Sequence, residues 1–133
     1  MKRVFLDANV LFSAAWRPNN GLLVLWQRPD LHLLSSDYAA AEARRNLPDE
    51  ARRQRLQALV AAVELVVTLH PALMAPLPTL RDKDRPIVWA AVQGRADVLL
   101  TGDLRDFGPW FGQSLLGVTV LQPTVFLQMP RAV

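Results

Sequence analysis

Short apolar segments alternate along this chain with segments that have helical features, and this alternation restricts the possible folds more than any other property. The apolar segments are rich in valine, leucine and phenylalanine, whereas the intervening segments carry capping residues or apolar side chains at helical spacing. Strands that alternate with helices predict an α/β domain with a mainly parallel central sheet. No repeat or low-complexity linker divides the 133 residues, so we expect a single domain over residues 1–133.

Local patterns predict where the individual elements lie. Strands are expected over residues 2–6, 31–35, 65–69, 97–101 and 118–121, which makes a sheet of about five strands. Helices are expected over residues 11–16, 21–27, 37–46, 50–63, 84–94 and 125–129. Residues 71–80 are proline-rich and residues 102–112 are glycine-containing, so both are expected to be loops, the second with a short helix.

The composition excludes several classes of protein. Because the chain has no cysteine, it can have no disulfide scaffold, cysteine-ligated zinc or catalytic thiol. Hydrophobic residues make up 51% of the chain, which argues against intrinsic disorder. Asp7 and Asn9 interrupt the apolar stretch that a signal peptide would need, and no segment reaches the roughly 18 apolar residues of a membrane span. We therefore expect a cytoplasmic protein with no membrane segment.

Acidic residues fall at informative places in this pattern. Asp7 directly follows the first strand, and Asp103 lies two residues beyond Thr101, where the fourth strand ends. Parallel sheets bind ligands at the carboxyl ends of their strands, which is where both acids would lie. Asp84 is at the start of the helix before the fourth strand, and Glu42 is within the helix after the second strand. We expect these four acids to form one site.

Carboxylates that converge repel one another, so a cluster of them needs a positive charge within it. Oxygen ligands without sulfur or histidine suit Mg²⁺ or Mn²⁺, and such an ion usually completes its shell with water and phosphate. Hydrolysis of a phosphodiester is the chemistry that follows. Taken singly, Asp7 and Asp103 are also typical turn residues, Asp84 a typical helix cap and Glu42 a typical solvated helix residue.

Four sequence blocks resemble those of the PIN-domain family. In chain order they are Val4–Leu11, Ser35–Glu42, Asp84–Ala91 and Ala96–Asp103. The first is an apolar strand that ends in Asp7 and is followed by Asn9, and the last is a strand that ends in Thr-Gly-Asp. The blocks span nearly the whole chain, and the pattern is most similar to stand-alone bacterial or archaeal PIN proteins of the VapC kind, the toxins of toxin–antitoxin pairs.

The resemblance implies a three-layer α/β/α fold and a metal-dependent endoribonuclease that cleaves RNA with Mg²⁺ or Mn²⁺. It also implies a small antitoxin protein as partner and a homodimer or higher homo-oligomer. The catalytic and metal-binding acids would be Asp7, Glu42, Asp84 and Asp103, with Asn9 and Thr101 as supporting residues and Asp106 as an additional acid. One departure concerns the metal stoichiometry, because many relatives have an acid where this chain has Lys83.

Two other functions fit part of the pattern. A phosphatase of the haloacid-dehalogenase type also has an Asp after its first strand, but it needs a second acid two residues later, where this chain has Asn9. A PIN-like domain could also bind RNA or protein without cleavage. The net charge of +3 is carried mainly by arginine. Five of the arginines are expected to form either a rim facing phosphate or an antitoxin, or a solvated helix face: Arg44, Arg45, Arg52, Arg53 and Arg55.

Overall fold

A six-stranded sheet is the centre of the computed structural model, which describes residues 1–75, 77 and 80–131. The strands are β1 (Lys2–Leu6), β2 (Leu31–Ser36), β3 (Glu64–Val66), β4 (Val98–Leu100), β5 (Ser114–Leu115) and β6 (Val118–Leu121). They lie in the order β3-β2-β1-β4-β6-β5, and every neighbouring pair is parallel except β5 and β6. The predicted α/β fold with a mainly parallel sheet is confirmed.

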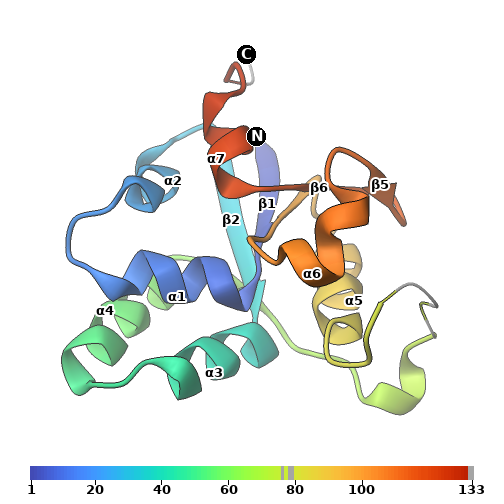
Figure 1. The fold of residues 1–133 in the computed structure, drawn as a ribbon, viewed down its shortest axis with the longest axis horizontal. Coiled ribbons are helices and arrows are strands. Elements are labelled where there is room, and N and C mark those ends of the chain that lie inside the picture. The colour runs from blue at the N-terminus through green and yellow to red at the C-terminus, as the bar shows by residue number, and fades with distance from the viewer. Residues whose placement is uncertain (76, 78–79, 132–133) are drawn as a thin grey trace.

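Helices cover the sheet on both sides. They are α1 (Ala8–Trp16), α2 (Val24–Gln27), α3 (Asp37–Asn46), α4 (Glu50–Ala61), α5 (Arg85–Gln93), α6 (Leu104–Phe107) and α7 (Pro123–Gln128). Figure 1 shows β1 and β2 between two groups of helices, with α1, α2 and α4 on the left and α5 and α6 on the right. This is the arrangement of a three-layer α/β/α fold. Among the described residues, none of the helices combines the length and the hydropathy that crossing a membrane requires.

The observed elements differ from the predicted ones in a few places. The third strand ends at Val66 rather than residue 69, and residues 71–73 of the expected loop form a 3₁₀ turn. Residues 76, 78 and 79 of that loop lie outside the described part of the chain. Sequence patterns missed β5, because two residues are too few to show strand alternation. A tight turn connects it to β6, with positive φ at Leu116 and Gly117, as hairpin turns of this kind require.

The three central strands of the sheet are largely buried because helices cover both faces. The side chains of Phe5, Leu34 and Leu100 are fully buried. On α3, Ala39 and Ala43 are also fully buried. Their small side chains let this helix lie close to the rest of the core. Glu42 is one helical turn after Ala39 and adjacent to Ala43, so it lies near the edge of the sheet.

Three of the five arginines named above donate hydrogen bonds to backbone carbonyls of the fold. The Nε atoms of Arg52 and Arg55 donate hydrogen bonds to Trp16 O and Ala15 O, each at 3.0 Å. Arg53 Nε donates to Leu47 O at 3.1 Å. The last carbonyls of a helix have no hydrogen-bond donors within the helix, and two of these arginines are the donors for α1. The expectation that all five arginines form a rim or a solvated face is therefore wrong: of the five, only Arg44 and Arg45, both on α3, are exposed.

The burial of Leu34 gives a direct test of this core. The substitution Leu34→Ala should lower the free energy of unfolding by about 2–5 kcal/mol, because it removes a fully buried side chain and leaves a cavity. Leu73→Ala is the matched control, because Leu73 is 70% exposed and its truncation should change stability little. Urea unfolding measures both, and equal losses for the two variants would contradict the described packing.

Candidate active site

The strand order creates a switch point at the carboxyl ends of β1 and β4. From β1 the chain moves outward to β2 and β3, then crosses back to β4 on the other side of β1. Ligands bind at such points in open α/β sheets, because the loops diverge there and leave a crevice. Asp7 follows β1 and Thr101 follows β4, and Asp7 N donates to Leu100 O at 3.0 Å. The two strand ends thus hold both side chains at the same place.

Asp7 is buried, with 4% of its surface exposed, and both of its carboxylate oxygens accept hydrogen bonds. Oδ1 accepts from Ala8 N at 2.7 Å and thereby caps α1. Oδ2 accepts from Thr101 Oγ1 at 2.8 Å and from Asn9 Nδ2 at 3.2 Å. The cap starts α1 at Ala8, three residues earlier than predicted, and fixes the orientation of the carboxylate.

Burial is the largest influence on the protonation of Asp7. It raises the pKa of this carboxyl from its ordinary value of 3.8 to about 6. The hydrogen bonds from Thr101 and Ala8 oppose that rise in pKa, and the charges of Glu42 and Asp103 add to it. A carboxylate in this setting gains from any cation that replaces its proton.

Asn9 and Thr101 connect the two strand ends through their side chains. Asn9 Oδ1 accepts from Gly102 N at 2.8 Å, and Asn9 Nδ2 donates to Thr101 Oγ1 at 3.1 Å. Asp103 N in turn donates to Thr101 Oγ1 at 3.1 Å. These bonds place Asp103 next to Asp7, and Asp103 Oδ1 caps α6 by accepting from Asp106 N at 3.1 Å. Both supporting residues implied by the resemblance thus contact the acids.

Asp84 occupies the cap position of α5, but its side chain makes no cap hydrogen bond. Asp84 is therefore at the start of the helix as predicted, but its carboxylate is free of a capping hydrogen bond. Only 5% of the residue is exposed, and burial raises the pKa of Asp84 to about 7. Oδ1 pairs with Lys83 Nζ at 3.2 Å, whereas Oδ2 is buried without a hydrogen-bond partner. A buried oxygen without a partner is costly, and a bound ion would satisfy it.

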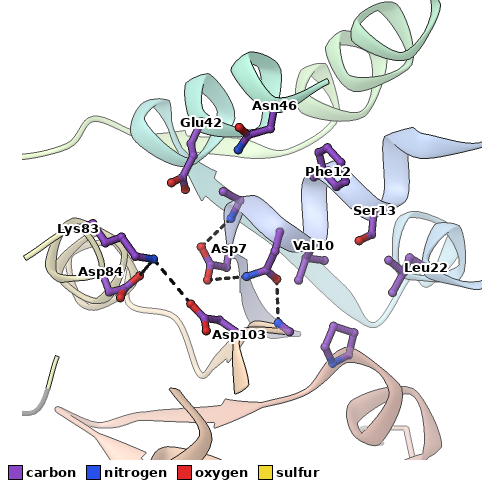
Figure 2. A pocket seen from close by; sticks show the side chains of 14 residues that line it. Asp7, Val10, Phe12, Ser13, Leu22, Glu42, Asn46, Lys83, Asp84 and Asp103 are labelled. Atoms are coloured by element: carbon purple, nitrogen blue, oxygen red, sulfur yellow. Dashed lines mark hydrogen bonds and ion pairs between the residues drawn. The ribbon is translucent and has the colours of Figure 1, made fainter. Parts of the chain in front are cut away.

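The four predicted acids line one cavity of about 550 Å³. Figure 2 shows Glu42 pointing down from its helix toward Asp7, with Asp84 and Asp103 on the opposite side of the same space. Polar side chains complete the wall together with a few apolar ones, among them Asn9, Ser13, Asn46, Lys83, Phe12 and Leu22. The structure therefore brings together acids that are up to 96 positions apart in the sequence.

A tighter group of carboxylates lies on one side of this cavity. Asp84, Asp103 and Asp106 each offer an oxygen within 4.8 Å of the others. Among the described residues, this is the group of acids whose oxygens lie close enough to bind one metal ion. Asp106 Oδ1 also pairs with Arg81 Nε at 3.1 Å, a contact between residues 25 positions apart that no local pattern predicts. A donor set made only of carboxylate oxygens fits a hard divalent cation.

Comparison with family models identifies the family to which the chain belongs. Residues 3–105 match the model of the PIN domain, and the chain belongs to that family. Members of the family are generally nucleases, and they generally use divalent metal ions. Comparison with curated protein sequences found no match.

Solved structures share the fold at low sequence identity. VapBC2 from Rickettsia felis, bound to a DNA fragment from its promoter, has a TM-score of 0.61 and 12% identity, over 90% of this chain and 98% of that one. FitAB bound to the IR36 DNA fragment has a TM-score of 0.55 and 20% identity, over 90% and 94% of the two chains. FitAcB from Neisseria gonorrhoeae has the same TM-score and identity, over 91% and 98%.

The raised pKa values predict how stability depends on pH when a chelator removes divalent ions. Between about pH 4 and pH 7 the folded protein retains protons on Asp7 and Asp84 that the unfolded chain has lost. The free energy of unfolding should therefore decline as pH rises through this range. In Asp7→Asn the decline should be shallower, by at most about 1.4 kcal/mol per pH unit.

Urea unfolding at several pH values measures this difference. Asp82→Asn is the control, because Asp82 is exposed and does not line the cavity. Equally steep declines in the wild type and in Asp7→Asn would show that Asp7 does not hold its proton in the folded state.

Proposed function

We propose that this chain is a metal-dependent endoribonuclease in which residues 1–133 act as one PIN domain. The observation that carries the proposal is the convergence of Asp7, Glu42, Asp84 and Asp103 on a single cavity at the switch point of the sheet. Four carboxylates that line one cavity are expected where a protein binds a cation and a phosphate together.

Asp7, Asp84 and Asp103 would hold Mg²⁺ or Mn²⁺, and Glu42 would either bind the ion or orient the attacking water. When bound, such an ion stabilises charge on the phosphoryl oxygen and makes a coordinated water more acidic. The side chains around the acids support this role. Thr101 and Asn9 donate hydrogen bonds to Asp7 and so favour its ionised form at a fixed orientation.

Glu42 differs from the other three acids in its setting. It is partly exposed, and its carboxylate points into the cavity from α3. A partly solvated carboxylate at the mouth of a site is suited to accept the proton that an attacking water gives up. Arg44 and Arg45 follow on the same helix and are exposed, so they offer positive charge for the phosphates of a bound strand.

We further propose that the substrate is RNA, that the protein acts in the cytoplasm, and that it pairs with a small antitoxin protein and self-associates. The structural neighbours VapBC2 and FitAB support the antitoxin partner, since the chain shares their fold. The phosphatase alternative is not favoured, because the chain belongs to a different family and Asn9 stands where that mechanism needs an acid.

Cleavage of a fluorescent RNA in Mn²⁺ tests the activity. Asp7→Asn should lower the cleavage rate by at least about 100-fold, since it removes a buried ligand from the cation site. Asp82→Asn, purified in the same way, should cleave at the wild-type rate. Equal rates for the wild type and Asp7→Asn would point to a contaminating nuclease and contradict the proposal.

Expression in a bacterial host tests the toxin role. Induction of the wild-type chain should arrest growth, and Asp103→Asn should relieve the arrest because it weakens the same site. Colony counts after induction, with immunoblots to match protein levels, measure both. Growth arrest by both variants at equal levels would contradict a nuclease toxin, and normal growth with the active wild type would favour a role in RNA processing.

A further inference from the structure

Lys83 places a permanent positive charge inside the acidic group of the active site. Its Nζ lies 3.2 Å from Asp84 Oδ1, 3.2 Å from Asp106 Oδ2 and 3.8 Å from Asp103 Oδ2. Figure 2 shows the ammonium directed between Asp84 and Asp103. These are the same three carboxylates whose oxygens lie within 4.8 Å of one another. We call the space among them the outer position, and the space between Asp7, Asp84 and Asp103 the inner position.

We propose that the Lys83 ammonium is a built-in cation that fills the outer position, so that the pocket takes up one divalent ion, at the inner position. The inference rests on the proposed function for its choice of cation. It deepens that function by assigning the number of ions and by naming the residue that sets it.

Lys83 and a second divalent ion would exclude each other. A Mg²⁺ ion bound to these three carboxylates would lie at about 2.1 Å from their oxygens, in the space that the ammonium already approaches. Two cations so close repel strongly where the surroundings are poorly solvated. Two of the three carboxyl groups are poorly solvated, since the side chains of Asp84 and Asp106 are each 7% exposed, whereas that of Asp103 is 21% exposed.

The backbone of Lys83 is anchored at this place. Tyr38 Oη donates a hydrogen bond to Lys83 O at 2.8 Å, and Asp84 N donates to Arg81 O at 3.0 Å. Arg81 also pairs with Asp106, so this acid meets two cationic side chains. An exposed lysine pair on a protein surface contributes little, but here the partners are buried and the attachment of the lysine is fixed.

Lys83 neutralises only one of the two carboxylate oxygens of Asp84. Lys83 contacts Oδ1, whereas Oδ2 is buried and has no hydrogen-bond partner. An unpartnered buried oxygen is costly, so the Asp84 carboxylate can still gain from a further cation. The lysine therefore satisfies one oxygen of Asp84 and leaves the other available to a divalent ion.

Calorimetric titration of the metal-free protein with Mn²⁺ tests the inference. The wild type should bind one ion, and Lys83→Met, which has a similar length and no charge, should bind a second. Lys83→Arg should bind one ion because it keeps the charge. Lys2→Met is the matched control, since Lys2 is the other lysine of the chain and lies at the opposite end of β1. Circular dichroism of each metal-free variant verifies folding, and Lys83→Gln replaces Lys83→Met if the latter does not fold.

Three results would overturn the inference: two ions in the wild type, equal stoichiometry and affinity in the wild type and Lys83→Met, or loss of all binding in folded Lys83→Met. The last would mean that the lysine only holds the acids in place. RNA cleavage by the wild type, measured on the same preparation, reports on the proposed function separately. A change in stoichiometry without cleavage would leave the role of Lys83 standing and remove the nuclease.

Discussion

Mutual repulsion among carboxylates is the constraint to which the rest of this structure responds. Asp7, Asp84 and Asp103 would move apart in an unfolded chain, and folding brings them to the rim of one cavity. Burial alone makes that costly, because it raises the pKa of Asp7 to about 6 and that of Asp84 to about 7. The fold offsets this cost with directed hydrogen bonds at Asp7 and with the ammonium of Lys83 beside Asp84.

The sheet makes this concentration of charge possible. Parallel pairing of β1 with β4 puts two strand ends side by side, and the apolar residues that precede those ends are buried in the core. Residues Asn9 and Thr101 then join the two ends with side-chain hydrogen bonds. The placement of Asp7 and Asp103 in the candidate site thus follows from the pairing of β1 with β4.

Much of this arrangement could be predicted from sequence, because local patterns encode it. Asp7 and Asp103 follow apolar strands, so a parallel sheet places them together, and the resemblance to PIN domains added Asp84 and Glu42. The rest depends on contacts between distant residues. The unpaired oxygen of Asp84, the pairing of Arg81 with Asp106 and the contact of Tyr38 with Lys83 have no local signal. Two-residue β5 was too short to recognise, and the arginines of α4 resembled a solvated face although they cap another helix.

Those arginines have a consequence for Asp7. Helix α1 begins at the residue after Asp7, and its last carbonyls accept hydrogen bonds from Arg52 and Arg55 of α4. Helix α1 is therefore held by hydrogen bonds at both ends. Asp7 itself caps the first end, and helix α4, which does not line the cavity, holds the other. A natural variant with lysine in place of these arginines would keep the net charge. It would lose the guanidinium hydrogen bonds to α1, and the helix that Asp7 caps would be held less firmly.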